Sequence, residues 1–357
     1  MSDMNYNSMS AAAARNEAPY EGASAPAEEK KQKKTEKKKK RRRRMLYVLI
    51  FVAAFLAGVA SKRISPSWAK DYTAEWDDSL GTLEKDLPYG DKPAQKYDLY
   101  LPADDTKDSY GLVIYLHPGG FTSGDKSGDV NMLSWLCKKG YVAAGINYTL
   151  FTEENPDANI YTQSVEIRDA VPVIVDKAKE LGYNITEMAA GGGSAGHCLA
   201  MLYAYRDADT SPVSVKFVFG AVGPSSFYPE DWGCYGFDQG TDKALEGAAG
   251  LFGKMAGKEI TPDMFGTPAY DDAMKDISAL LNIDDDTVPS LFCYGAYDKV
   301  QSFAASKRLD VALTEHGIPH DYLVAPHSGH GLQNDSGVMH EYSKKLAEYL
   351  DTYLPVQ

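Results

Sequence analysis

The chain has 357 residues and a formal net charge of −13, enough for one large or two ordinary domains with a buried core. The charge is uneven: residues 1–63 carry 15 Lys/Arg and 6 Asp/Glu, whereas the remainder carries 22 basic and 44 acidic residues. The remainder, which would form the globular part, is too acidic for nucleic-acid binding, because that function needs a basic face. This acidity also argues against anionic lipids or acidic polymers as favoured substrates.

The N-terminal region is predicted to lie outside the globular fold. Residues 1–44 read as a disordered, basic, cytoplasmic tail, because the first 29 lack an apolar period and residues 30–44 contain 12 Lys/Arg. A nuclear or nucleic-acid signal would fit that basic run taken alone. Residues 45–61, 17 uncharged and mostly apolar residues, instead predict a single transmembrane signal-anchor helix. The charge asymmetry then places the N-terminus in the cytoplasm and the remainder outside.

A cleaved signal peptide, giving a secreted protein, is the alternative for this segment. Gly58-Val59-Ala60 offers the small residues that a cleavage site needs. The 44 residues ahead of the apolar run are long for a signal peptide, which favours the uncleaved anchor. Residues 62–87 are mostly polar and predict a linker between the membrane and the next domain.

Residues 88–357 alternate predicted strands and helices. The apolar runs predict strands at residues 95–101, 111–117, 141–147, 185–190, 213–222, 289–294 and 321–325. The helical patterns cover residues 130–139, 160–181, 194–205, 303–316 and 336–353. Alternation at this spacing predicts an α/β fold with a mostly parallel central sheet and helices on both faces. Residues 224–286, rich in Gly, Asp and aromatics, break the rhythm and predict a lid-like insertion.

The most informative motif is GGSAG at residues 192–196, a G-x-S-x-G match between a predicted strand and a predicted helix. That position puts Ser194 on a sharp turn with its hydroxyl exposed. The segment also matches the dinucleotide motif G-x-G-x-x-G, which requires an acidic residue at the end of the following strand. Asp207 and Asp209 fall in a loop before that strand, so the nucleotide interpretation is the weaker one.

Three further motifs accompany Ser194 in an order that suits nucleophilic catalysis. The sequence HPGG at 117–120 follows a predicted strand, and Asp298 and His330 each come just past a later one. The chain order Ser, Asp, His is that of an α/β-hydrolase triad. His327 competes with His330 for the role of base, and Asp298 could instead cap a helix.

With these motifs placed, residues 88–357 resemble the α/β-hydrolase fold serine esterases. Within them the chain is similar to the hormone-sensitive-lipase-like and feruloyl- and acetyl-xylan-esterase-like enzymes with an H-G-G-G-type oxyanion loop. The resemblance rests on YDLYLP at 97–102, HPGGF at 117–121, NY at 147–148, GGSAG at 192–196, GAYDKV at 295–300 and GHGL at 329–332. Pro118 departs from the family's usual glycine, and proline has no amide hydrogen to donate.

The resemblance implies a division of labour among the motif residues. Ser194 would attack the ester carbonyl, His330 would transfer the proton, and Asp298 would orient the imidazole. The backbone amides expected to bind the oxyanion are those of Gly119, Gly120 and Ala195. His117 is expected to brace this loop, and substrate contacts are expected at Phe121 and at Trp232 of the insertion.

The sequence therefore predicts a membrane-anchored, extracytoplasmic serine hydrolase that cleaves carboxylic esters through an acyl-enzyme. The acyl group is expected to be short, on a small-molecule or a glycan ester, acetylated or feruloylated by resemblance only. A serine peptidase of the same fold and a non-catalytic surface binding domain are the alternatives. No metal or organic cofactor is expected, and the four cysteines show neither metal spacing nor a disulfide framework.

Overall fold

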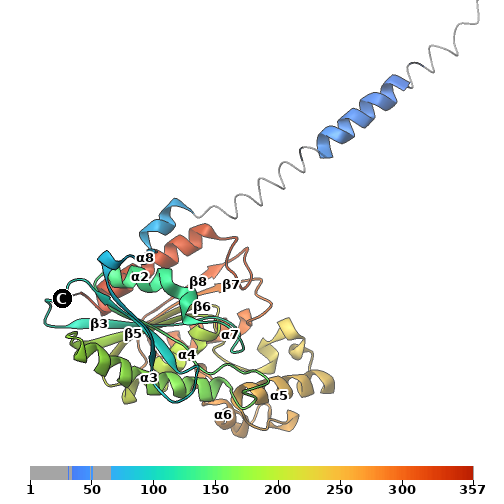
Figure 1. Cartoon of the computed structure of the whole chain (residues 1–357). Coiled ribbons are helices and arrows are strands. Elements are labelled where there is room, and N and C mark those ends of the chain that lie inside the picture. Colours follow the sequence, from blue (N-terminus) through green and yellow to red (C-terminus); the bar gives the residue numbers. More distant parts are fainter. Residues whose placement is uncertain (1–30, 32–33, 49, 51–65, 357) are drawn as a thin grey trace, which may run out of the picture. The chain divides into compact units, whose positions relative to one another are not determined.

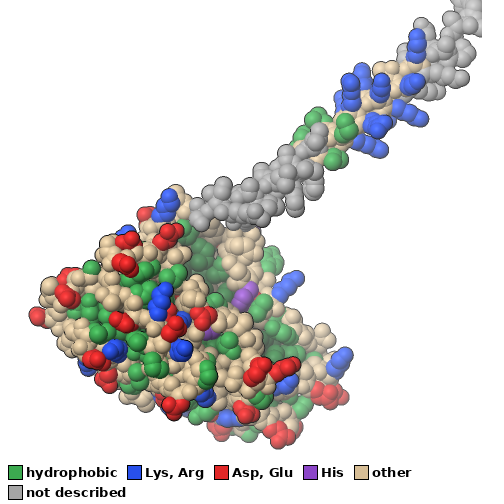
Figure 2. Space-filling view, in the orientation of Figure 1, with side chains coloured by type: hydrophobic (Ala, Val, Ile, Leu, Met, Phe, Trp, Pro, Cys, Tyr) green, Lys and Arg blue, Asp and Glu red, His purple; other side chains and the backbone are tan. Residues whose placement is uncertain are grey.

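The computed structural model describes residues 31, 34–48, 50 and 66–356, and the chain divides into two units, residues 1–64 and 65–357. In the first unit, residues 34–48 are helical, and Lys and Arg side chains project all round this helix (Figure 2). Most of the segment predicted to span the membrane, 45–61, lies outside the described residues, as do residues 1–29. Among the helices that the structure describes, none is long and apolar enough to cross a membrane.

The second unit is built on one eight-stranded sheet in the order β1-β2-β4-β3-β5-β6-β7-β8 (Figure 1). β1 and β2 are antiparallel to their neighbours, and all the other pairs are parallel. The strands are β1 (Gly81–Pro88), β2 (Lys96–Pro102), β3 (Tyr110–Leu116), β4 (Val142–Ile146), β5 (Ile185–Gly193), β6 (Ser214–Ala221), β7 (Ser290–Gly295) and β8 (His320–Ala325).

Helices cover both faces of the sheet, as the sequence predicts for an α/β-hydrolase fold. α2 and α8 lie on one face and α3 and α4 on the other (Figure 1), while α7 packs against β7 and β8. The helices are α2 (Val130–Lys138), α3 (Ile160–Glu180), α4 (Ala195–Tyr205), α5 (Asp242–Ala256), α6 (Pro268–Met274), α7 (Phe303–Glu315) and α8 (Ser336–Tyr353). The predicted strands and helices agree with these bounds to within a few residues.

β3 and β4 are apolar along their whole length, and β5 is so from Met188 onward, because helices pack on both faces of these strands. β3 and β5 are adjacent and parallel, with Leu112 paired to Met188 and Leu116 paired to Gly192. Their carboxyl ends therefore meet at one edge of the sheet, where α/β folds bind ligands. The motif at residues 117–120 follows β3, and Ser194 follows β5.

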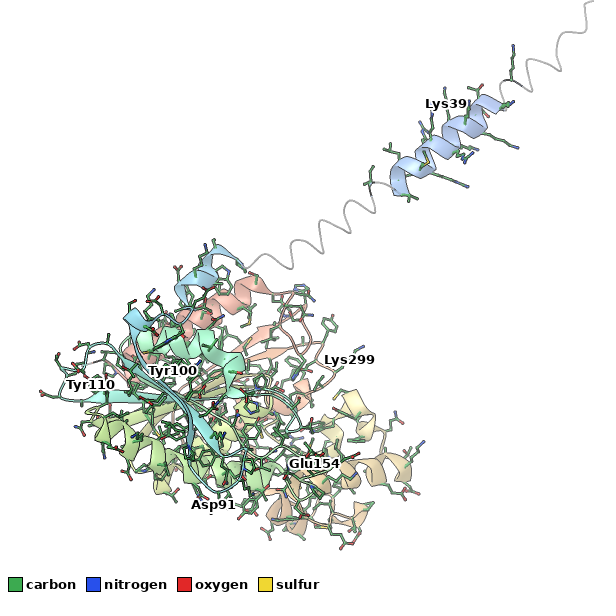
Figure 3. The ribbon with its side chains drawn as sticks, in the orientation of Figure 1. Lys39, Asp91, Tyr100, Tyr110, Glu154 and Lys299 are labelled. Carbon is green, nitrogen blue, oxygen red and sulfur yellow. The ribbon has the colours of Figure 1, made fainter. Side chains whose placement is uncertain are left out.

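The prediction that residues 62–87 form a linker is wrong where the structure describes them. Residues 67–87 belong to the globular unit. β1 pairs antiparallel with β2, and Trp135 Nε1 donates a 2.9 Å hydrogen bond to the carbonyl oxygen of Asp71. Trp76 packs edge-on against Tyr100 of β2, which Figure 3 labels. An edge strand with one solvated face keeps polar residues in its pattern, and this explains why the segment resembles a linker.

The insertion at 224–286 contains α5, α6 and several short 3₁₀ turns, and it has an aromatic core of its own. Trp232 stacks on Phe227 and meets Phe252 edge-on, with ring centroids 5.8 and 5.4 Å apart. The Trp232 indole also donates to the carbonyl oxygen of Ser226. The side chain is 1% exposed, so the expected contact between Trp232 and substrate is wrong: this residue stabilises the insertion from within.

Candidate active site

Ser194 occupies the tight turn between β5 and α4. Its φ of 50° and ψ of −116° place a non-glycine residue in a sparsely populated backbone region. Strain of this kind persists only where the surroundings over-determine it, and it presents the side chain outside the regular elements. The Ser194 amide donates to the carbonyl oxygen of Ala221 on β6, which fixes the turn to the sheet.

Two positions of the motif must be glycine because other backbone atoms come too close to leave room for a side chain. A Cβ atom at Gly196 would lie 1.9 Å from the carbonyl oxygen of Leu116, at the end of β3. A Cβ atom at Gly192 would lie 2.4 Å from the carbonyl carbon of Gly196. Both distances are far below van der Waals contact, so the G-x-S-x-G spacing reflects packing of the turn against the neighbouring strand.

Ser194, His330 and Asp298 form a continuous hydrogen-bonded chain. His330 Nε2 lies 2.8 Å from Ser194 Oγ, and His330 Nδ1 lies 2.8 Å from Asp298 Oδ2. A carboxylate can only accept hydrogen bonds, so Nδ1 carries the proton and Nε2 accepts from the serine hydroxyl. This tautomer is the one that a general base for serine requires.

Asp298 is itself held in place by backbone donors. The amides of Val300 and Gln301 donate to its Oδ1 at 2.8 and 2.9 Å, which leaves Oδ2 for His330. The carboxylate side chain is 1% exposed, whereas the His330 side chain is 27% exposed. The acid is therefore shielded from water, while the imidazole and the serine remain open to a substrate.

The loops that carry the acid and the imidazole are tied together directly. The Tyr297 amide donates to the carbonyl oxygen of Ser328, at 2.9 Å. A Cβ atom at Gly295 would lie 2.3 Å from the carbonyl oxygen of Gly329, so only glycine allows the two loops to approach this closely. The hydrogen bond between Asp298 and His330 depends on this contact.

The rival base, His327, points elsewhere. Its side chain is 77% exposed, and its Nδ1 lies 2.9 Å from Asp335 Oδ1. Asp335 also accepts from the His327 amide and the Ser328 hydroxyl, so it organises the loop. The structure brings His330, and not His327, to Ser194.

The loop after β3 brings two glycine amides and Ala195 to the same edge of the sheet. Gly119 and Gly120 have φ values of 141° and 61°, and a Cβ atom at Gly119 would lie 1.9 Å from the carbonyl oxygen of Ser123. Within residues 66–356, no carbonyl or side chain accepts from the amides of Gly120 and Ala195. These two amides are therefore available to an anionic oxygen, which is what an oxyanion site requires.

His117 braces this loop from the core side, as the sequence analysis expects. Its Nδ1 donates to the carbonyl oxygen of Pro118 at 2.9 Å, and its ring stacks on Tyr148 with centroids 4.3 Å apart. The Tyr148 hydroxyl donates in turn to the His117 carbonyl oxygen. Burial lowers the pKa of His117, so the ring is neutral and acts as packing. His197, behind the nucleophile, is also buried, and burial lowers its pKa to about 3.

Sequence analysis missed Gln163, a fully buried residue of α3. Its Nε2 donates to the carbonyl oxygens of Phe121 and Thr149, both at 2.9 Å. Phe121 is a non-glycine residue with a φ of 67°, so its backbone needs such support. A polar residue on the apolar face of a predicted helix is the signal that could have identified Gln163.

An apolar cavity of about 200 Å³ lies between the oxyanion loop and the insertion. Gly120 and Phe121 of the loop line it together with Leu251 and Met255 of α5. Phe121 therefore lines a cavity next to the site, and its contact with substrate stays a prediction. Figure 2 shows histidine and hydrophobic side chains gathered where this face of the second unit is hollowed.

The fold and the arranged side chains define a class: an α/β hydrolase in which a serine, a histidine and a buried aspartate are hydrogen-bonded beside two free amides. The BD-FAE family model matches residues 97–313, more than half of the chain. The chain therefore belongs to the BD-FAE family of α/β-hydrolase esterases.

Individual relatives are more distant. The chain is 30% identical to kynurenine formamidase of Danio rerio over 145 residues, which cover 40% of the chain and 45% of that protein. It is 26% identical over 275 residues to dipeptidyl peptidase family member 6 of Caenorhabditis elegans, covering 75% of the chain and 33% of that protein. The chain thus spans less than half the length of these two curated relatives.

A solved structure of a truncated carbohydrate esterase from gut microbiota superposes with a TM-score of 0.59 at 17% identity. The superposition covers 77% of this chain and 97% of the other. At this identity the likeness shows the α/β-hydrolase fold.

Proposed function

We propose that this esterase hydrolyses carboxylic esters through a covalent acyl-enzyme formed on Ser194. The observation that carries the proposal is the hydrogen-bonded chain from Ser194 through His330 to Asp298. In the first step, Ser194 Oγ attacks the ester carbonyl while His330 Nε2 takes its proton. His330 then gives that proton to the departing alkoxide, and the alcohol leaves.

The second half of the reaction reuses the same groups. A water molecule gives a proton to His330 and attacks the acyl carbon, and the proton then returns to Ser194 as the acid leaves. The developing oxyanion in each half faces the amides of Gly120 and Ala195, with Gly119 beside them. One such donor contributes about 2.7–4 kcal/mol to transition-state stabilisation. Asp298 remains ionised and stabilises the imidazolium that forms twice per turnover.

For the substrate we propose a small-molecule or glycan ester, with an acetylated or feruloylated glycan as the first to test. The open position of the imidazole and the carbohydrate esterase among the structural neighbours support this choice. A serine peptidase of the same fold is the second candidate, because one curated relative is named as a dipeptidyl peptidase family member.

We further propose that the N-terminal region anchors the enzyme in a membrane, with its catalytic unit on the extracytoplasmic side. The support is the sequence: 12 Lys/Arg in residues 30–44, followed by 17 uncharged residues. Full-length protein in a bacterial host should sediment with membranes and resist carbonate extraction. A mature N-terminus near Ser61 would instead show a cleaved signal peptide and a secreted enzyme.

The test of the activity is a hydrolysis screen over p-nitrophenyl acyl esters, acetylated and feruloylated glycans, and aminoacyl amides. The Ser194→Ala variant serves as the blank for each substrate. Cleavage of the esters alone supports the proposal, and cleavage of the amides alone favours the peptidase. If no substrate is cleaved and a fluorophosphonate labels nothing, the chain is a binding domain on a hydrolase scaffold.

A further inference from the structure

The cavity beside the oxyanion loop differs in character from the rest of this acidic unit. Its lining is mostly apolar, with Thr122, Asn159 and Lys254 of α5 as the residues that have polar side chains. Of the residues that line it, Lys254 is the one with an ionisable side chain, and no carboxylate is among them. The walls thus combine a mostly apolar surface with a single positive charge.

The ammonium group of Lys254 is free to meet a ligand. The side chain is exposed, and within the described part of the second unit it has no ion pair or hydrogen bond. By contrast, Lys258, one turn further along, is paired with Asp276 at 2.8 Å. Lys254 also lines a neighbouring depression together with Asp157, and no ion pair joins the two side chains. Glu154, labelled in Figure 3, lines a further depression with Asp157.

The size of the cavity limits what it can hold. A cavity needs about 10–15 Å³ of such space to hold one water molecule, so about 200 Å³ accommodates a chain of several carbon atoms. An acetyl group would leave most of this space empty. The lining by Gly120 places part of such an occupant next to the oxyanion site, and Lys254 lines the same cavity.

We infer that this cavity is a subsite for an apolar chain of several carbon atoms that ends in a carboxylate. The group is one of the two that flank the ester: the acyl chain of a dicarboxylic acid monoester, or the alcohol part derived from an ω-hydroxy acid. The apolar chain would lie between Phe121 and Leu251, and its carboxylate would meet Lys254. The inference rests on the proposed function and extends it to substrate class.

The test compares matched substrates that differ only in the terminal group. In the acyl arm, p-nitrophenyl hemiadipate is compared with p-nitrophenyl hexanoate. In the alcohol arm, 6-acetoxyhexanoate is compared with hexyl acetate. In one arm, wild-type kcat/KM should favour the anionic substrate about two- to fivefold, within the range for an exposed ion pair. The preference should shrink in 0.5 M NaCl.

Variants of two lysines on the same helix attribute the effect. Lys254→Met should abolish the preference for the anionic substrate, and Lys254→Glu should reverse it. Lys243→Met is the matched control, because Lys243 is exposed on α5 but does not line the cavity, and it should keep the wild-type ratio. Equal kcat/KM values for the paired substrates in both arms, or a preference that survives in Lys254→Met, would overturn the inference.

A binding measurement separates this inference from the proposed activity. In the Ser194→Ala background, monomethyl adipate should raise the melting temperature more than methyl hexanoate does, and Lys254→Met should remove the difference. Stabilisation by the anionic ester in a protein without esterase activity would sustain the subsite while the proposed function fails. Ester hydrolysis without any anionic preference or stabilisation would leave the function intact and remove the subsite.

Discussion

The side-chain amide of Gln163 lies 2.9 Å from the carbonyl oxygen of Phe121, so helix α3 directly supports the loop that presents the oxyanion amides. Phe121 has a positive φ, and the Phe151 amide donates to the same carbonyl. The oxyanion loop is therefore positioned from behind by a residue that does not reach the substrate. Gln163 is in this sense a positioning residue.

Replacing Gln163 should slow the chemical step more than it weakens substrate binding. Gln163→Met keeps the volume but leaves the buried Thr149 carbonyl oxygen without a donor and the Phe121 carbonyl oxygen with the Phe151 amide alone. We expect kcat to fall about 10- to 100-fold with KM nearly unchanged. Gln163→Glu should be worse at neutral pH, because an ionised carboxylate cannot donate. Affinity for an alkyl boronic acid, which forms a tetrahedral adduct, should fall in parallel. A folded Gln163→Met enzyme with wild-type kcat would exclude this role.

The triad assignment separates two histidines three residues apart. Ser194→Ala and His330→Ala should each lower kcat by about 10⁴- to 10⁶-fold, because nucleophile and base act as a unit. Fluorophosphonate labelling should disappear in Ser194→Ala. His327→Ala is the matched control: it removes one hydrogen bond to Asp335 and should stay within about threefold of wild type. A large loss at His327 and a small one at His330 would reverse the assignment.

Trp232 should matter for stability and not for substrate choice. Trp232→Ala empties a buried aromatic cluster, and the free energy of unfolding should fall by about 3–5 kcal/mol. Tyr235, its half-exposed neighbour, is the control, and Tyr235→Ala should cost about 1 kcal/mol or less. Urea titration of both variants measures the difference. An altered substrate ranking at unchanged stability would mean that Trp232 does contact the substrate.

The carboxyl group of Asp129, at the start of α2, should make stability depend on pH. Burial raises its pKa to about 6, and its Oδ2 has no partner within the described residues. The folded state then binds the proton more tightly than the unfolded state, so the contribution of Asp129 to stability falls as the pH rises from 4 through 6. The fall has an upper limit of about 3 kcal/mol.

Asp129→Asn cannot ionise and should lack this contribution. Its free energy of unfolding relative to wild type should therefore increase between pH 4 and pH 8, whatever the offset that the amide introduces at pH 4. Urea titrations of both proteins at the two pH values measure the change. A difference that stays constant with pH would mean that Asp129 titrates normally.

The position of β1 predicts where the catalytic unit begins. A protein that starts at residue 66 retains β1, the Trp135–Asp71 hydrogen bond and the Trp76–Tyr100 contact, and it should fold to a monodisperse, cooperatively melting protein. A protein that starts at residue 88 exposes the edge of β2 and should aggregate. Circular dichroism and size-exclusion chromatography distinguish the two. Equal melting temperatures would make residues 66–87 dispensable.

The sequence by itself determined the architecture and the chemistry of the candidate site. Alternating apolar strands and amphipathic helices specify a parallel sheet covered on both faces, because each element must bury its apolar surface. The spacing around Ser194 identifies the turn, since glycines are required where Gly196 meets the end of β3. The alternation is set by residues close in the sequence, and the glycines stand at a fixed spacing around one serine, so both can be recognised as patterns.

Only the tertiary structure decided which distant residues meet. That His330 and not His327 reaches Ser194 follows from how the loops after β7 and β8 pack at Gly295, across 136 residues of sequence separation. The half-polar edge strand β1, the support from Gln163 and the burial of Trp232 depend on long-range packing as well. A side chain's environment is set by elements that approach in space, so a lone glutamine or tryptophan carries no sequence pattern that reveals its neighbours.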